Sequence, residues 1–233
     1  DAGPQYLEAG TKLLLGQYTI TGYLNCGGFG ITYLARDSLE RTVVIKECFP
    51  SELAFRFGSA MAPRSSKYKK ELTAIVRHFV NEAHSLAAVT HPNIVHVHQI
   101  FEENDTAYMS MDFVDGPDLL DLLASKRTFT PEEVQGLTIK MLHAISFVHA
   151  RDLLHRDISP DNILIDKSGE PILIDFGAAR QHAKVTQRAL SKLKFVKDGY
   201  SPQEFYISGS EQGTWSDLYS FAASMYHVIQ GRP

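Results

Sequence analysis

The chain of 233 residues contains little cysteine and no long hydrophobic run. Its two cysteines, Cys26 and Cys48, exclude a disulfide framework and favour a reducing compartment, so we expect the cytoplasm. No stretch approaches the roughly 18 uninterrupted apolar residues of a membrane-spanning helix, and the start of the chain lacks the basic and then apolar pattern of a signal peptide. These absences predict no membrane contact from this segment.

An excess of one charge is also absent. The formal net charge is -4 and the pI is about 6.2, which argues against a nucleic-acid partner because such proteins usually carry a basic face. Hydrophobic residues make up 44% of the chain and charged residues 21%, the balance of a globular protein with its own core. The composition leaves the oligomeric state undetermined.

Hydrophobic patterning changes from strands in the first half to helices in the second, which favours an α+β protein of two lobes. Thr130, followed by Pro131, is a predicted helix N-cap, and Gly231 is a predicted helix stop. The predicted strands cover residues 18–45, 91–101, 107–114, 162–166 and 171–175, and the predicted helices cover residues 71–89, 118–125, 131–150 and 215–230.

These patterns divide the chain into three parts. We expect a loose N-terminal arm over residues 1–16, a first lobe over 17–114 and a second lobe over 115–233. Residues 47–70, which are rich in proline, glycine, serine and basic side chains, are interpreted as an insertion with one helical turn.

Several short motifs follow one another in a fixed order, and the order carries more weight than any one of them. They are NCGGFG at 25–30, VVIK ending at Lys46, Glu82 on a predicted helix, HRDISPDN at 155–162, IDFG at 174–177, SPQE at 201–204 and WSDLYSFAASMY at 215–226. Together they resemble the signature set of protein kinases from about Tyr18 to Pro233. The runs GGFGITYLARD, IKECFPSELA and HRDISPDNIL are most similar to bacterial serine/threonine kinases of the eukaryotic (Hanks) type.

This resemblance implies both a fold and a reaction. The fold is a small antiparallel β-sheet lobe with one helix, followed by a mainly α-helical large lobe. The reaction is transfer of the γ-phosphate of ATP to a serine or threonine of a protein, with Mg²⁺ or Mn²⁺ as the metal. The protein substrate includes the chain itself, through autophosphorylation.

Five polar residues carry the catalytic chemistry that the resemblance implies. Lys46 supplies a point charge for the α- and β-phosphates, and Glu82 fixes its direction by an ion pair. Asp157 is the base that orients the substrate hydroxyl. Asn162 and Asp175 offer the hard oxygen ligands that Mg²⁺ prefers.

The nucleotide site follows from the Gly-rich turn and from strand alternation. Glycines let backbone N–H groups approach phosphate oxygens closely. Alternation puts Val44, Lys46 and Cys48 on one face, with Val43 and Ile45 on the core face. By resemblance, the nucleotide-binding residues are Gly27, Gly28, Phe29, Gly30, Thr32, Val44, Lys46, Met111, Asp112, Val114 and Leu164, and Asp217 braces the catalytic loop.

The chain departs from the family pattern at three places. Asn25 stands at the first glycine of the loop, where its tolerance of left-handed backbone keeps the turn feasible. Ser159 occupies the lysine position of the catalytic loop, which removes a positive charge and predicts a slower enzyme, so that Ser159→Lys should leave activity equal or higher. The helices that normally complete the large lobe do not follow residue 230. Either the chain is a fragment of a longer protein, which we favour, or another chain or segment covers the exposed surface.

The segment 178–200 is the equivalent of the activation loop. Two interpretations stay open for it: phosphorylation that orders the segment through arginine pairing, or an ordinary solvated basic loop. The candidates for phosphorylation are Thr186 and Ser191, and Arg156 precedes the catalytic aspartate. The basic residues of the segment are Arg188, Lys192, Lys194 and Lys197.

Rival functions also remain. A pseudokinase that binds ATP as a scaffold is disfavoured because all five catalytic residues are present, although Asn25 and Ser159 keep it open. A small-molecule kinase is disfavoured by SPQE and the long activation segment. His91, His96 and His98 suggest a metal site only weakly, because no cysteine or carboxylate partner is evident.

Overall fold

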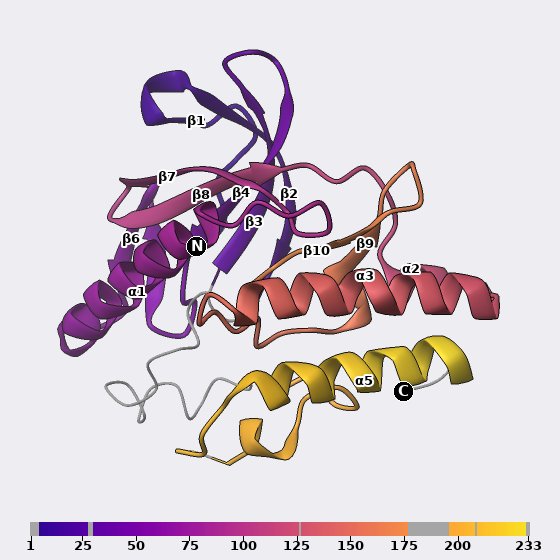
Figure 1. Cartoon of the computed structure of the whole chain (residues 1–233). Coiled ribbons are helices and arrows are strands. Elements are labelled where there is room, and N and C mark those ends of the chain that lie inside the picture. The colour runs from indigo at the N-terminus through magenta and orange to yellow at the C-terminus, as the bar shows by residue number, and fades with distance from the viewer. Residues whose placement is uncertain (1–4, 28–29, 126, 177–195, 208, 232–233) are drawn as a thin grey trace. The chain divides into compact units, whose positions relative to one another are not determined.

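The computed structural model describes residues 5–27, 30–125, 127–176, 196–207 and 209–231. This part of the chain divides into two compact units, which are treated one at a time (Figure 1). The first contains residues 5–88 and 96–113, and the second contains the remainder. Among the described helices, none combines the length and hydrophobicity needed to cross a bilayer.

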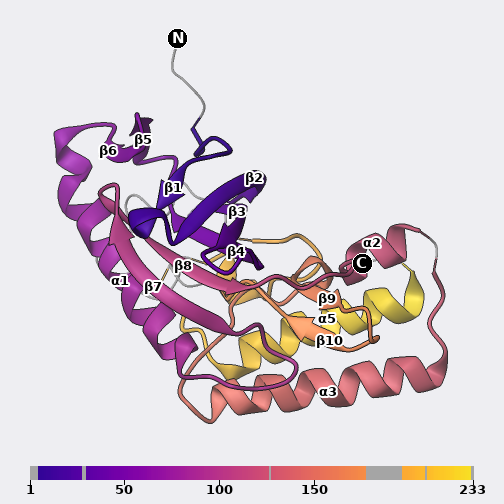
Figure 2. The ribbon, with the colours of Figure 1, turned by 90° about the horizontal axis from the view of Figure 1, so that it is seen from above.

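A six-stranded antiparallel sheet forms the first unit, in the order β1-β2-β3-β4-β8-β7. Helix α1 packs along β7 and β8, and both views show it beside these strands (Figures 1 and 2). The predicted antiparallel sheet with one helix is thereby confirmed. The elements are β1 (Lys12–Leu13), η1 (Leu14–Gly16), β2 (Tyr18–Cys26), β3 (Gly30–Asp37), β4 (Thr42–Cys48), β5 (Ala54–Phe57), β6 (Ala60–Pro63), η2 (Ser66–Tyr68), α1 (Lys69–Ala87), β7 (Val97–Glu103) and β8 (Thr106–Asp112).

The structure differs from the sequence prediction at two segments of this unit. Residues 12–13 pair with β2 and Leu13 is fully buried, so the segment expected to be a loose arm contributes to the sheet and its core. The insertion contains a β-hairpin, β5–β6, before the short helical turn η2. Its strands are only four residues long, so they show too little alternation to be recognised in the sequence.

Helices dominate the second unit, in which α3 and α5 lie side by side (Figures 1 and 2). Thr130 and Glu133 form a capping box at the start of α3, and Gly231 ends α5 in the left-handed conformation with φ 70°. Both helix ends are as predicted. The elements are α2 (Leu119–Ala124), α3 (Pro131–His149), η3 (Pro160–Asn162), β9 (Ile163–Ile165), β10 (Pro171–Leu173), η4 (Gln203–Phe205) and α5 (Thr214–Gln230).

Two connections of the second unit hold the short hairpin β9–β10 in place. The N–H of Val95 donates to the carbonyl of Leu173, so residues 89–95 belong with this unit. On the other strand, a Cβ at Gly116 would lie 1.8 Å from the carbonyl oxygen of Ile165. Only glycine fits so close to another backbone.

Candidate active site

One face of the first-unit sheet collects five of the predicted nucleotide-binding residues. Thr32 pairs with Lys46, and Val44 pairs with Met111. Because paired residues and residues two apart share a face, Gly30, Thr32, Val44, Lys46 and Met111 all lie on the same side. Lys46 and Val44 are half-buried, whereas Val43 and Ile45 on the opposite face are buried, as the alternation predicted.

Cys48 shares the Lys46 face but is completely buried. Burial raises the pKa of its thiol far above the usual range, and the neighbouring carboxylate of Glu47 acts in the same direction. A thiol held protonated is a poor nucleophile. Cys48 therefore acts as a core residue at the end of β4.

The Gly-rich turn joins β2 to β3. The N–H of Gly27 donates to the carbonyl of Gly30 at 2.9 Å, while Gly28 and Phe29 lie outside the described residues. A Cβ at Gly30 would approach the carbonyl oxygen of Glu47 to 2.6 Å, so this glycine is required by the close packing of β3 on β4. Asn25 lies in the extended strand β2 and pairs with Thr32, so the left-handed backbone considered for it is not needed.

The bonds made by Asp112 at the end of β8 limit which of its groups could contact adenine. The N–H of Asp112 donates to the carbonyl of His96 at 3.0 Å, and the Asp112 carboxylate lies 2.8 Å from Nε2 of His98. A contact of Asp112 with adenine would therefore use its carbonyl. Val114 follows in the second unit, where Leu164 lies on β9.

Glu82 lies half-buried on α1, next to the buried Ala83. The helix packs against β4, which carries Lys46. The predicted ion pair between Lys46 and Glu82 stays a prediction.

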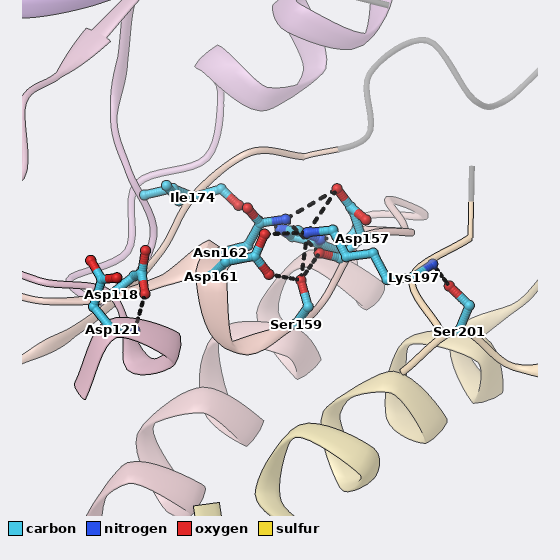
Figure 3. A network of polar contacts seen from close by, with 10 residues as sticks. Asp118, Asp121, Asp157, Ser159, Asp161, Asn162, Ile174, Lys197 and Ser201 are labelled. Carbon is cyan, nitrogen blue, oxygen red and sulfur yellow. Dashed lines mark hydrogen bonds and ion pairs between the residues drawn. The ribbon is translucent and has the colours of Figure 1, made fainter. Parts of the chain in front are cut away.

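Asp157 and Asn162 meet in the catalytic loop of the second unit (Figure 3). The amide Nδ2 of Asn162 donates to the backbone carbonyl of Asp157 at 2.7 Å and to its carboxylate Oδ2 at 3.1 Å. These bonds fix the orientation of the amide and direct its oxygen away from Asp157. Asn162 also accepts at its backbone carbonyl from the N–H of Ile174, immediately before Asp175.

His155 connects the same two segments from below the loop. Its Nδ1 accepts from the N–H of Asp157, so its Nε2 carries the proton and donates to the carbonyl of Ile174 at 2.8 Å. Complete burial lowers the pKa of His155 even though the carboxylates of Asp217 and Asp157 oppose the shift. The ring of Phe176 packs on the neutral imidazole with centroids 4.4 Å apart.

Asp217 on α5 holds the backbone of the loop. Its carboxylate is 1% exposed and accepts from the N–H groups of His155 and Arg156 at 2.8 and 2.7 Å and from Nε2 of His149 at 2.8 Å. Burial alone would raise the pKa of Asp217, but these donors outweigh burial and lower it. Asp217 is therefore ionised and braces the catalytic loop, the role that the resemblance assigned to it.

Backbone strain marks the two segments on which the catalytic and metal-binding predictions depend. Arg156 has φ 63° and Asp175 has φ 57°, in the left-handed region that non-glycine residues avoid. Such conformations persist only where surrounding bonds enforce them. Here the bonds from Asp217 and from the Ile174 backbone do so.

Asn162 and Asp175 suit a metal that is bound together with a nucleotide. Both offer hard oxygen atoms, and two protein ligands suffice when phosphates supply the others. Within the described ranges, no three His, Cys, Asp or Glu side chains cluster as metal ligands. The rings of His96 and His98 pack edge to face, with their centroids 5.2 Å apart.

Some residues that matter here were missed or misassigned from the sequence. Lys197, expected in a basic loop, contacts Ser159 and Asp161 of the catalytic loop. Glu47 and Arg56 form a fully buried ion pair at 2.6 Å that no motif indicated. Thr186, Arg188, Ser191, Lys192 and Lys194 lie outside the described residues, so the predicted phosphorylation stays a prediction.

Comparisons with known proteins show which sequences and folds the chain is similar to. A family model described as "Protein kinase domain" matches residues 24–233. Serine/threonine-protein kinase PrkC of Bacillus subtilis is 29% identical over 95% of this chain, which covers 31% of that protein. Serine/threonine-protein kinase C of Synechocystis sp. is 33% identical over 95% of this chain and 40% of its own length. The chain thus spans about a third of the length of these relatives.

A solved structure described as "PpkA-294 apo form" matches 99% of this chain and 80% of its own with 35% sequence identity. Its TM-score of 0.83 indicates the same fold over nearly the whole chain.

Proposed function

The chain belongs to the protein kinase domain family, and from this premise we propose that it transfers the γ-phosphate of ATP to a serine or threonine hydroxyl of a protein. The observation that supports the proposal best is the set of hydrogen bonds joining Asp157, Asn162 and the backbone before Asp175. The proposed base is thus held against Asn162, and the backbone next to Asp175 is tied to the same loop, before any substrate binds.

Each proposed residue has one task in the reaction. Asp157 accepts the proton of the substrate hydroxyl, whose oxygen forms a bond to the γ-phosphorus while the bond to the β–γ bridging oxygen breaks and ADP leaves. Lys46, oriented by Glu82, holds the α- and β-phosphates. The face of the sheet formed by Gly30, Thr32, Val44 and Met111 receives the nucleotide.

The family uses ATP with a divalent metal, and we propose Mg²⁺, with Mn²⁺ able to replace it. Asn162 and Asp175 would hold the ion through their side-chain oxygens. When bound, the metal neutralises charge on the phosphates. The contribution of the protein is to hold Asn162 through Asp157 and to enforce the strained backbone at Asp175.

A radiolabelled ATP assay with a generic protein substrate tests this function, with Asp157→Asn as the control. We expect label on serine or threonine of the substrate, and on the chain itself, and a loss of at least about 100-fold in Asp157→Asn. Nucleotide binding without transfer by the unmodified chain would instead support the ATP-binding scaffold. Label on a small molecule but on no protein would support the small-molecule kinase.

The setting in which the domain acts also belongs to this proposal. We propose the reducing cytoplasm as this setting, where thiols such as Cys26 and Cys48 stay free. We propose a protein substrate and no nucleic-acid partner. In a longer protein that contains this chain, other segments would also influence the choice of substrates and partners.

A further inference from the structure

Ser159 leaves the catalytic loop without the positive charge that the kinase pattern has at this position. Its side chain is completely buried and ends in a neutral hydroxyl. Asp157 and Asp161 lie on either side of it in the chain, so the loop by itself presents two carboxylates and no lysine. Two negative groups beside a triphosphate raise the energy of the reacting complex.

A lysine from 38 residues further along the chain occupies this place in the structure (Figure 3). The Nζ of Lys197 donates to Ser159 Oγ at 2.7 Å and to Asp161 Oδ2 at 2.6 Å, and it lies 3.7 Å from Asp157 Oδ2. The Ser159 hydroxyl in turn donates to Asp161 Oδ1 at 2.6 Å, so its lone pair is directed to the ammonium. The ammonium is thus shared by three residues of one loop.

The backbone around Lys197 is also fixed. Its N–H donates to Ser201 Oγ at 2.8 Å, and its carbonyl accepts from the N–H groups of Tyr200 and Ser201. The side chain remains 32% exposed, so Lys197 is not enclosed in the core. Tight backbone anchoring of a long, partly exposed side chain lowers the entropy lost when it acts.

We propose that Lys197 replaces the lysine missing at position 159 and supplies positive charge beside Asp157 during phosphoryl transfer. This inference rests on the proposed kinase function. Lys197 acts as a positioning residue: it orients the Asp157 carboxylate, offsets the charge of Asp161 and favours the developing negative charge of the transferring group. A lysine that only tied residues 196–201 to the loop would need Asp161 alone, whereas this ammonium also faces Asp157.

Steady-state kinetics with ATP and a protein substrate test the proposal. Lys197→Met keeps most of the length of the side chain but removes the charge, and we expect kcat to fall by about 100-fold with little change in the KM for ATP. Lys197→Arg keeps the charge and should retain most of the kcat. Lys140→Met is the matched control, because it removes an ammonium that pairs with Glu170 at 2.6 Å elsewhere in the unit, and its kcat should equal that of the unmodified chain.

Placing the lysine at position 159 tests its charge separately from its bond between residue 197 and the catalytic loop. Ser159→Lys alone would bring two ammonium groups together at a buried position, so the earlier expectation of equal or higher activity applies only when Lys197 is shortened. Ser159→Lys combined with Lys197→Ala returns a charge to the loop while leaving residue 197 untied. We expect this double variant to recover at least about 10-fold in kcat over Lys197→Ala.

The outcomes discriminate as follows. Recovery in the double variant supports the charge role. A kcat for Lys197→Met within about threefold of the unmodified chain, or a loss that the double variant does not recover at temperatures where every variant is folded, overturns it. An unmodified chain that transfers no phosphate removes the proposed function and this inference together, whereas an active chain indifferent to Lys197→Met removes the inference alone.

Discussion

Glu47 is a carboxylate inside the core of the first unit. It is fully buried on the Val43 and Ile45 face of β4, where it accepts from Arg56 Nη2 at 2.6 Å and from the hydroxyls of Tyr33 and Tyr108 at 2.7 and 3.1 Å. Burial and the nearby carboxylate raise the pKa of both tyrosines, so they stay neutral donors. Burial disfavours the charged Arg56, but Glu47 outweighs it and raises the pKa of the guanidinium.

Arg56→Met should therefore be costly. It leaves Glu47 charged and buried with only tyrosine partners, and the loss of one member of such a pair destabilises proteins by about 3 kcal/mol or more. Urea unfolding of the isolated chain measures this. Arg36→Met, which breaks an exposed contact with Glu40 at 3.9 Å, is the control and should cost less than about 1 kcal/mol. Equal effects of the two changes would mean that the buried pair contributes no more than a surface one.

Helix α3 shows how a local motif fixes the start of an element. The hydroxyl of Thr130 accepts from the N–H of Glu133, and the Glu133 carboxylate accepts from the N–H of Thr130 at 2.9 Å. Thr130→Ala removes one half of this box and should lower the free energy of unfolding by about 1 kcal/mol. The exposed Thr128 lies just outside the helix, and Thr128→Ala should change stability by less than about 0.5 kcal/mol. Thermal unfolding of the two variants side by side gives the comparison, and a cap variant as stable as the control would contradict it.

Elements with strong local signals could be predicted, whereas those that depend on distant partners could not. The Thr130 cap, the Gly231 stop and the alternation along β4 were all read from neighbouring residues. Glu47 obeys that alternation, yet a carboxylate on a core face is acceptable only because Arg56 lies opposite it in a hairpin that was itself missed. Lys197 reaches Ser159 across 38 residues, and no local pattern specifies such a contact.

At the scale of the whole molecule, three histidines make the free energy of unfolding depend on pH: His155 and His227 are buried, and His91 is half-buried. Burial lowers the pKa of His91, His155 and His227, with Asp217 and Asp157 opposing the shift at His155 and His143 assisting it at His91. A lowered pKa means that the unfolded chain binds more protons below about pH 6.5 than the folded chain does. Stability supplied by the neutral rings is therefore complete above that pH and is lost as the pH falls towards the lowered values.

We expect the Tm to fall steadily between pH 7 and pH 5, before the carboxylates titrate. Calorimetry in buffers of equal ionic strength measures this, and a Tm that is constant or rises over the range would contradict the assignment of neutral buried rings. Asp217, whose pKa is lowered, contributes at higher pH and loses its contribution only as the pH falls below about 4.

The contact between Lys197 and Ser159 also affects how kinase domains are classified as active or inactive from sequence motifs alone. A survey that discards every domain lacking a lysine two positions after the aspartate of HRD would count this one as dead, although an ammonium reaches the same spot from another stretch of chain. A charged group can come from a different position in the sequence and still occupy the same place in the structure. Inactive relatives are therefore better identified from the positions of charged groups in the structure than from the residue type at one position of a motif.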